Sequence, residues 1–181
     1  MSDVTVVCCY NNEKMYADFV GTLKSQDCPC EVIGIDNRGN KGFTSCAAAY
    51  NSVIDRVKTK YVVYSHQDIL LEDAGAMSKF AEYLGRTNRN DILGVAGIRL
   101  DRPGVISNIR HRQNYRNGEI SYAGPRRVEG GMMTCGTVDE CFFGGHTEHF
   151  REYPFNEDLC DDWHLCAAST GFAGITPRIS L

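Results

Sequence analysis

The sequence predicts an α/β fold in which helices flank a mostly parallel, doubly wound sheet. Short apolar runs rich in β-branched residues, typical of strands covered on both faces, recur through the first half of the chain. Segments with helical periodicity separate these runs, and such alternation is typical of parallel sheets with right-handed crossovers. Polar residues directly follow several runs, at the strand ends where open α/β sheets bind ligands.

Four strands are expected in the first 98 residues, with three helices between them. The strands are Val4–Cys9, Glu31–Ile35, Tyr61–Tyr64 and Asp91–Ile98. The helical stripes run from Tyr16 to Leu23, from Cys46 to Val57 and from Met77 to Leu84, with Asp73 capping the third helix. This regular order predicts the doubly wound sheet.

The second half of the chain is less regular. Residues 99–127 are rich in Gly, Asn and Arg, so we expect a long loop or an irregular hairpin there. A strand over Thr137–Phe143, closed by Gly144 and Gly145, should follow, and then a helix from about Cys160 to Ser169 and a short last strand. No Ser- or Pro-rich linker divides the chain, so residues 1–181 are expected to form a single domain.

Composition excludes several classes of protein. The chain is 23% charged and 43% hydrophobic, as in soluble globular proteins, and its net charge of −4 argues against a nucleic-acid partner. No basic leader precedes the first strand, and no apolar run approaches the ~20 residues of a transmembrane segment. We therefore expect a cytoplasmic protein whose 9 cysteines are reduced thiols. The sequence leaves its oligomeric state open.

Polar side chains follow the first three predicted strands, and parallel strands bring such ends to one rim of a sheet. They are Asn11 with Glu13, then Asp36, then His66 with Asp68. A nucleotide on this rim needs an acceptor for its base or ribose, which suits Asp36, and a cation for its pyrophosphate, which suits Asp68. Each has a plainer alternative: Asp36 would begin an Asx-turn, and His66-Gln67-Asp68 would be a solvated strand end.

Six segments, taken in order, resemble the GT-A-fold glycosyltransferases, specifically the family-2-like group. Val4–Glu13 resembles that family's first strand with its aromatic-Asn-x-Glu turn, Val32–Asp36 its second strand, and Lys41–Asn51 its Gly-x-x-x-Ala-x-x-Asn helix. Tyr61–Asp68 is similar to the strand with the Asp-x-Asp metal motif, Asp139–Gly145 to the acceptor strand, and Phe155–Leu165 to the Glu-Asp-x-x-Leu helix. Nearly the whole chain takes part in this resemblance.

The resemblance implies a metal-assisted transferase that moves a sugar from a nucleoside diphosphate, most often UDP, to a saccharide or other hydroxyl acceptor. Residues 1–98 would bind the donor and residues 99–181 the acceptor. The matching positions assign nucleotide binding to Tyr10, Asn11, Glu13, Asp36, Asn51 and Gln67. His66 and Asp68 would sit at the Mn²⁺ or Mg²⁺ ion and the diphosphate, and Asp161 or Asp162 would be the general base of an inverting reaction.

The chain departs from the family pattern at two sites, and one is the base region, which reads Asp161-Asp162-Trp163-His164 rather than Glu-Asp. His66 replaces the first acid of Asp-x-Asp, which favours Mn²⁺ over Mg²⁺ and makes a catalytically silent nucleotide-sugar binding module a second hypothesis. A nucleotidyltransferase is a third, but the Gly-rich, basic loop it needs is missing after the first strand.

His146 and His149 would complete a metal shell or orient a sugar, or else be exposed histidines at a helix start.

Overall fold

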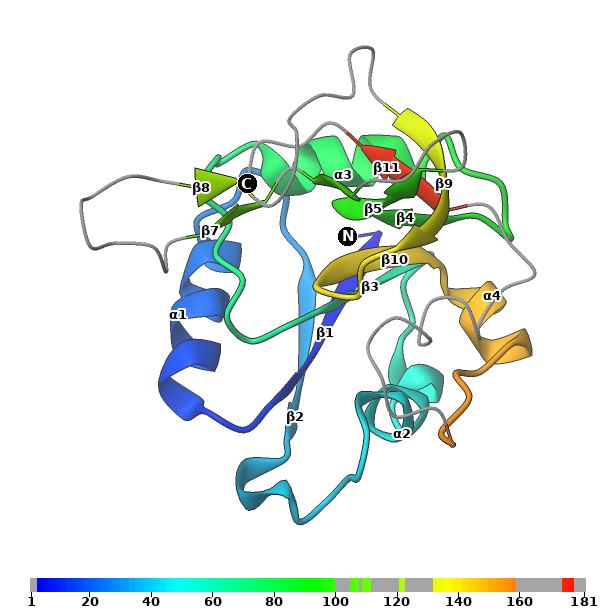
Figure 1. Cartoon of the computed structure of the whole chain (residues 1–181). Coiled ribbons are helices and arrows are strands. Elements are labelled where there is room, and N and C mark those ends of the chain that lie inside the picture. Colours follow the sequence, from blue (N-terminus) through cyan, green and yellow to red (C-terminus); the bar gives the residue numbers. More distant parts are fainter. Residues whose placement is uncertain are drawn as a thin grey trace.

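The computed structural model describes residues 3–99, 105–107, 109–111, 121–122, 132–158 and 174–177. In this part of the chain, helices cover both faces of a large central sheet, with α1 and α3 on one side and α2 and α4 on the other (Figure 1). The helices are α1 (Glu13–Lys24), α2 (Cys46–Asn51), α3 (Ala76–Leu84) and α4 (Thr147–Glu152). The molecule is thus a three-layer α/β/α structure.

The described strands form a nine-stranded sheet with the order β2-β1-β3-β10-β4-β11-β9-β5-β6, and β7 pairs with β8 in a separate ribbon. The first-half strands are β1 (Val4–Tyr10), β2 (Glu31–Asp36), β3 (Tyr61–Ser65), β4 (Ile92–Gly94) and β5 (Ala96–Arg99). The others are β6 (Val105–Ser107), β7 (Arg110–His111), β8 (Ser121–Tyr122), β9 (Met132–Val138), β10 (Phe142–His146) and β11 (Gly174–Pro177).

Strand direction confirms the predicted fold class. In the large sheet β1, β2, β3, β4, β5 and β11 run one way, and β6, β9 and β10 run the other way. The parallel pairs of β1 with β2 and with β3 bring the carboxyl ends of these three strands to one rim. The sheet is therefore mostly parallel, with antiparallel strands inserted beyond β3.

The prediction that Gly144 and Gly145 close a strand is wrong, because both lie inside β10, between β3 and β4. At Gly144 a Cβ would lie 2.3 Å from the carbonyl oxygen of Val62 and 2.9 Å from the Cα of Val63. Glycine at this position permits a close backbone approach rather than a turn. The turn instead falls at residues 139–141, between β9 and β10.

Three other predicted boundaries also differ. The expected strand Asp91–Ile98 divides at Val95, whose N–H donates to the Phe142 carbonyl 3.2 Å away, and β5 then pairs with β6 and β9. Asp73 does not cap α3; it accepts a hydrogen bond from Gly75, the residue at the N-cap. The stripe from Cys46 is a short α2 followed by a 3₁₀ turn over Ile54–Arg56. The expected helix over 160–169 lies outside the described residues.

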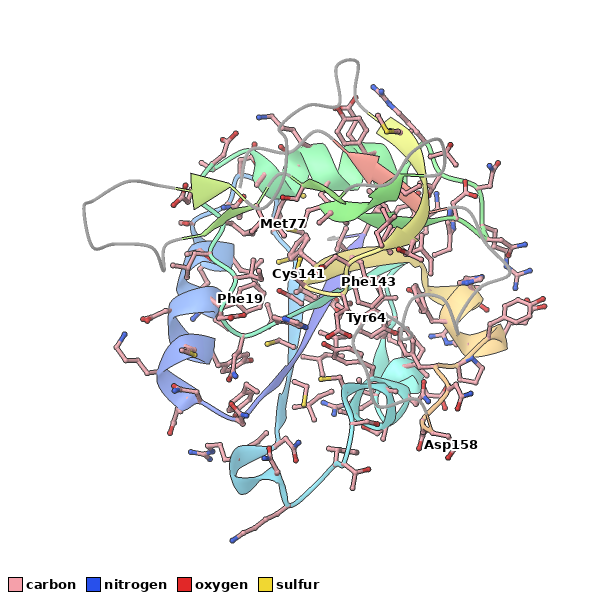
Figure 2. The ribbon with its side chains drawn as sticks, in the orientation of Figure 1. Phe19, Tyr64, Met77, Cys141, Phe143 and Asp158 are labelled. Atoms are coloured by element: carbon pink, nitrogen blue, oxygen red, sulfur yellow. The ribbon has the colours of Figure 1, made fainter. Side chains whose placement is uncertain are left out.

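Two apolar clusters hold the layers together. Phe19 and Met77, with Cys141 from the β9–β10 turn, pack between the sheet and α1 and α3. Tyr64 and Phe143 pack on the other side, toward α2 and α4, and Figure 2 shows the two groups on opposite sides of the central strands. All five side chains are buried, so the central strands are covered on both faces, as their apolar runs predicted. Of the described helices, none has the length and apolarity to cross a bilayer.

Candidate functional site

A cleft of about 620 Å³ opens at the carboxyl ends of β1 and β3. Its wall also includes the loop before α2, the first residue of α2 and the turn between β9 and β10. The lining residues are Cys9, Tyr10, Asn11, Asn37, Asn40, Phe43, Thr44, Ser45, Cys46, His66, Gln67, Asp68 and Glu140. The rim predicted from the polar strand ends is therefore a concave site, which is where open α/β sheets bind ligands.

Gln67 ties the end of β3 to the turn after β1. Its side-chain oxygen accepts hydrogen bonds from the backbone N–H groups of Asn11 and Asn12, at 3.0 and 2.8 Å. Its amide nitrogen donates to Asn11 Oδ1 at 2.7 Å. Asn12 in turn caps α1 by accepting from Met15 N. Gln67 thus fixes the β1–α1 turn relative to β3, which sets the shape of this part of the cleft.

His66 is paired with a buried acid from the adjacent turn between β9 and β10. His66 Nε2 lies 3.0 Å from Oε1 of Glu140, whose side chain is only 5% exposed. Burial lowers the pKa of His66, but the hydrogen bond and negative charge of Glu140 outweigh burial and raise that pKa above its ordinary value. Nε2 is engaged by Glu140, so Nδ1 is the ring nitrogen left to face another partner.

Asp68 is an exposed carboxylate on the cleft wall. Among the residues that the structure describes, no group of three or more His, Cys, Asp or Glu side chains is arranged to hold a metal ion. In proteins, however, Mg²⁺ is often bound by only one or two carboxylates, while substrate phosphates and water supply the other ligands. Asp68 could bind such a cation together with a bound phosphate. His66 could not bind it through Nε2, because that nitrogen is engaged by Glu140.

The loop between β2 and α2 is organised by one side chain. Asn37 Oδ1 accepts from Gly42 N and Phe43 N, at 3.0 and 2.9 Å, and Asn37 Nδ2 donates to the Phe43 carbonyl at 3.1 Å. These bonds fold the loop back on itself, with Gly39 and Asn40 at its tip in the left-handed region. The loop thereby places Thr44 and Ser45 along one wall of the cleft, and the Ser45 hydroxyl caps α2 by accepting from Ala48 N.

Asp36 and Glu13 are held by a residue that sequence reasoning overlooked. The guanidinium of Arg38 binds both oxygens of Asp36, with Nη2 2.6 Å from Oδ2, and its Nη1 lies 2.7 Å from Glu13 Oε2. The hydrogen bonds from Arg38 lower the pKa of Asp36. Asp36 thus begins a turn, as its plainer alternative predicted, and Arg38 satisfies both carboxylates beside the cleft.

Tyr10 supplies an aromatic wall at the end of β1. Its ring stacks on that of Tyr16 from α1, with centroids 4.1 Å apart and planes 6° from parallel. The stack fixes the orientation of Tyr10 before any ligand arrives. A flat, prearranged ring at the edge of a polar cleft suits a planar ligand.

The family comparison matches residues 5–174 of this chain to the model described as a glycosyltransferase-like family. The chain belongs to this glycosyltransferase-like family. The suspected resemblance and the GT-A-like fold are thereby confirmed. Comparison with curated protein sequences finds no match.

Several solved structures share the fold of this glycosyltransferase-like chain. A mannosyltransferase from Pyrobaculum calidifontis, PcManGT, in complex with GDP-Man and Mn²⁺, has a TM-score of 0.64 and 14% identity over 98% of this chain and 55% of its own. TarS of S. aureus has a TM-score of 0.56 and 14% identity over 97% of this chain and 35% of its own. A197 from STIV has a TM-score of 0.53 and 9% identity over 97% of this chain and 82% of its own.

The chain spans only about a third to just over half of the length of the TarS and PcManGT structures it matches. At identities this low, the likeness concerns the fold. Two further TarS structures hold UDP and UDP-GlcNAc, so neighbours with this fold bind nucleotide sugars.

The structure brings five of the predicted site residues together and separates three others from them. Tyr10, Asn11, His66, Gln67 and Asp68 all line the cleft. Glu13 and Asp36 lie beside it on Arg38, outside its lining. Asn51 is outside it as well, and Asp161 and Asp162 lie outside the described residues.

Asn51 connects α2 to the segment after α4. Its Nδ2 donates to the Phe155 carbonyl and to Glu157 Oε1, both at 2.9 Å, and its Oδ1 accepts from Phe155 N at 3.0 Å. The amide is thus committed to protein partners, although the resemblance assigned Asn51 to nucleotide binding. Its observed contacts position the segment that leads toward Asp161 and Asp162.

The two histidines near α4 serve the packing of the described part of the protein. His149 is buried in α4, with 3% exposure. Its ring contacts Phe150 edge-on and lies tilted against Tyr153, so it is not an exposed helix-start histidine. His146 ends β10 and contacts the Tyr61 ring edge-on. Neither histidine lines the cleft.

Sequence reasoning also missed Glu140, Cys9 and Cys46 as parts of the site. Glu140 lies 74 residues from His66, and nothing local to either residue indicates that they pair. The one available signal for Glu140 was an acid directly before a buried strand. Cys9 and Cys46 looked like ordinary core residues because each sits in an apolar pattern.

Proposed function

We propose that this chain transfers a sugar from a nucleoside diphosphate to a hydroxyl acceptor, with UDP as the expected nucleoside diphosphate. The observation that carries the proposal is the cleft at the ends of β1 and β3, which combines an aromatic wall, amide groups and a carboxylate. Family membership supports a transferase, and neighbours of the same fold hold UDP, UDP-GlcNAc or GDP-Man.

Each wall of the cleft has a part in donor binding. Tyr10, fixed by Tyr16, would stack on the base or ribose, and Asn11, fixed by Gln67, would hydrogen-bond to the ribose. Asp36 would accept a hydrogen bond from the base only by sharing its carboxylate with Arg38. Thr44 and Ser45 line the same cleft, and their hydroxyls would donate to the phosphates.

Asp68 would hold the divalent cation, Mn²⁺ or Mg²⁺, together with the diphosphate of the donor. When bound, such a cation neutralises the negative charge that develops on the leaving diphosphate. His66, held by Glu140, would keep its Nδ1 toward the same region and contact a phosphate oxygen or the cation. Glu140 would then orient His66 without touching the donor.

Asp161 or Asp162 would accept the proton of the acceptor hydroxyl, giving inversion at the anomeric carbon. Support comes from Asn51, which ties the preceding Phe155–Glu157 segment to α2. This contact holds the chain that leads to the two aspartates close to the donor half.

The test is calorimetric titration of UDP and GDP with and without MnCl₂, followed by measurement of UDP release from UDP-sugars. We expect manganese-dependent nucleotide binding that is weakened at least tenfold in Asp68→Asn, which keeps the shape of the side chain but removes its charge. Asp55→Asn, on the surface 3₁₀ turn, is the matched control and should bind like the wild type. Absence of binding to either nucleotide would overturn the proposal.

A nucleotide-sugar binding module without turnover is the second candidate. The observation that favours it is that the cleft lining has one exposed carboxylate, Asp68, and that the described residues contain no group of three or more His, Cys, Asp or Glu side chains placed to hold a metal ion. Manganese-dependent binding of UDP-sugars combined with no UDP release, with any hydroxyl acceptor offered, would establish the module and exclude the transferase.

A further inference from the structure

Two cysteines line the wall of the cleft. Cys9 lies near the end of β1, and Cys46 is the first residue of α2; both line the cleft wall. Both side chains are half-buried and pack against the same apolar cluster, on the α2 side of the sheet. Each thiol is the largest single influence on the pKa of the other, as expected for two groups that lie close together. They are therefore neighbours in space although 37 positions separate them in the sequence (46 − 9).

The other described cysteines differ from this pair. Cys8 is fully buried on the opposite face of β1, and Cys135 and Cys141 are buried. Cys28 and Cys30 pack against the cluster under α1 and α3. Among the described cysteines, Cys9 and Cys46 alone combine mutual contact with access to the cleft.

We propose that Cys9 and Cys46 form a dithiol modification site, which a peroxide or a small disulfide oxidises to an intramolecular disulfide. The bond would join the end of β1 to the start of α2 across the cleft wall. A disulfide bond needs two cysteines whose backbones are already close, and α2 and β1, the elements that carry this pair, pack against each other.

Reactivity within the pair is unequal. The neighbouring Cys46 thiol lowers the pKa of Cys9 against the opposing effect of burial, and Cys9 together with burial raises that of Cys46. Burial raises the pKa of the neighbouring Cys8 to about 12, so Cys8 stays protonated and unreactive. Cys9 is thus the nucleophile and Cys46 the resolving thiol.

A peroxide would oxidise the pair in two steps. The Cys9 thiolate attacks one peroxide oxygen, the O–O bond breaks, and hydroxide leaves, which gives a sulfenic acid at Cys9. Cys46 Sγ then attacks Cys9 Sγ, the S–O bond breaks, and the departing hydroxide takes the Cys46 proton as water. The two thiols lose two electrons in total, and the peroxide is reduced to two waters.

The consequence for the cleft rests on the proposed function. A bond between Cys9 and Cys46 would draw the start of α2 toward β1, beside Tyr10 and Ser45. The oxidised protein should therefore bind UDP with MnCl₂ about tenfold more weakly than the reduced protein, and dithiothreitol should restore binding.

Peptide mapping tests the site without relying on any nucleotide. The protein is treated with diamide or hydrogen peroxide, its remaining thiols are blocked, and it is digested with trypsin without reduction. We expect residues 1–14 linked to residues 42–56, with a mass two hydrogen atoms below the sum of the two peptides when residues 1–14 carry the blocking group on Cys8. Because residues 1–14 contain both Cys8 and Cys9, the link must persist in Cys8→Ala and disappear in Cys9→Ala and in Cys46→Ala.

Two outcomes would overturn the site: a link that is lost in Cys8→Ala and kept in Cys9→Ala, or oxidation of Cys28 and Cys30 that leaves the cleft pair reduced. Circular dichroism confirms that each variant is folded. If the link forms but oxidation leaves UDP binding unchanged, the effect on the cleft is refuted. If the link forms and reduced protein binds no nucleotide, the proposed function fails while the modification site stands.

Discussion

At the scale of single residues, the pair of His66 and Glu140 shows how the site is prearranged. A buried glutamate beside a partly exposed imidazole keeps the ring in one orientation and favours its charged form. Replacing His66 with Asp would restore the family's Asp-x-Asp spacing, but it would set a second carboxylate against Glu140. Restoring the motif therefore requires a change at Glu140 as well.

Glu140→Gln removes the charge of the pair but keeps the shape of the side chain. A raised pKa of His66 in the folded state means that the pair stabilises the protein below the unfolded pKa of about 6.5, and that this contribution is lost as the pH rises through the folded pKa. In metal-free buffer we expect Glu140→Gln to lower the free energy of unfolding by about 1–3 kcal/mol at pH 6 and by less at pH 8.5.

Urea denaturation at the two pH values measures this difference. Glu148→Gln is the matched control, because Glu148 is exposed and pairs with Arg151 on the surface. It should change stability by less than about 0.5 kcal/mol at both pH values. An effect of Glu140→Gln that is larger at pH 8.5 than at pH 6 would contradict the pairing described here.

At the scale of elements, the sequence predicted β1, β2 and β3 closely because their apolar runs and polar ends are local features. It did not predict that β10 lies between β3 and β4, because strand order depends on pairing between residues far apart in the chain. The glycines of β10 were misread for the same reason. Their role is visible only once the β3 backbone lies beside them.

Gly144→Ala tests the close approach of β10 and β3. The new Cβ would meet the Val62 carbonyl and the Val63 backbone, neither of which moves without disturbing the central sheet. We expect a loss of about 3 kcal/mol or more in the free energy of unfolding. Gly21→Ala, in α1 with open space around it, is the control and should raise stability by about 0.5–1 kcal/mol. Equal effects of the two substitutions would refute the role given to Gly144.

At the scale of the whole molecule, the site joins residues from both halves of the chain. The sequence indicated Asn11, His66 and Asp68 because they follow strands whose ends share a rim, and the family resemblance added Tyr10 and Gln67. Glu140 comes from a turn in the second half, and only the packing of β10 against β3 brings it to His66. Long-range pairing thus completed the part of the site that local patterns left out.

Asn51→Ala tests the link between the halves. It removes three hydrogen bonds to Phe155 and Glu157, so the free energy of unfolding should fall by about 1–3 kcal/mol. If Asp161 or Asp162 is the base, turnover should fall more than nucleotide affinity. Asn156→Ala, in the same segment but exposed, is the control and should stay within about 0.5 kcal/mol of the wild type. A larger loss of nucleotide affinity than of turnover would instead favour direct nucleotide binding by Asn51.

The central claim is that a nucleoside diphosphate and a cation meet beside Asp68. Paramagnetic broadening of amide resonances by Mn²⁺, recorded with UDP present, tests it most directly. We predict that the signals of Asn11, Ser45 and Asp68 broaden first, and that Asp68→Asn abolishes this pattern. Broadening centred elsewhere, or unchanged in Asp68→Asn, would contradict the account.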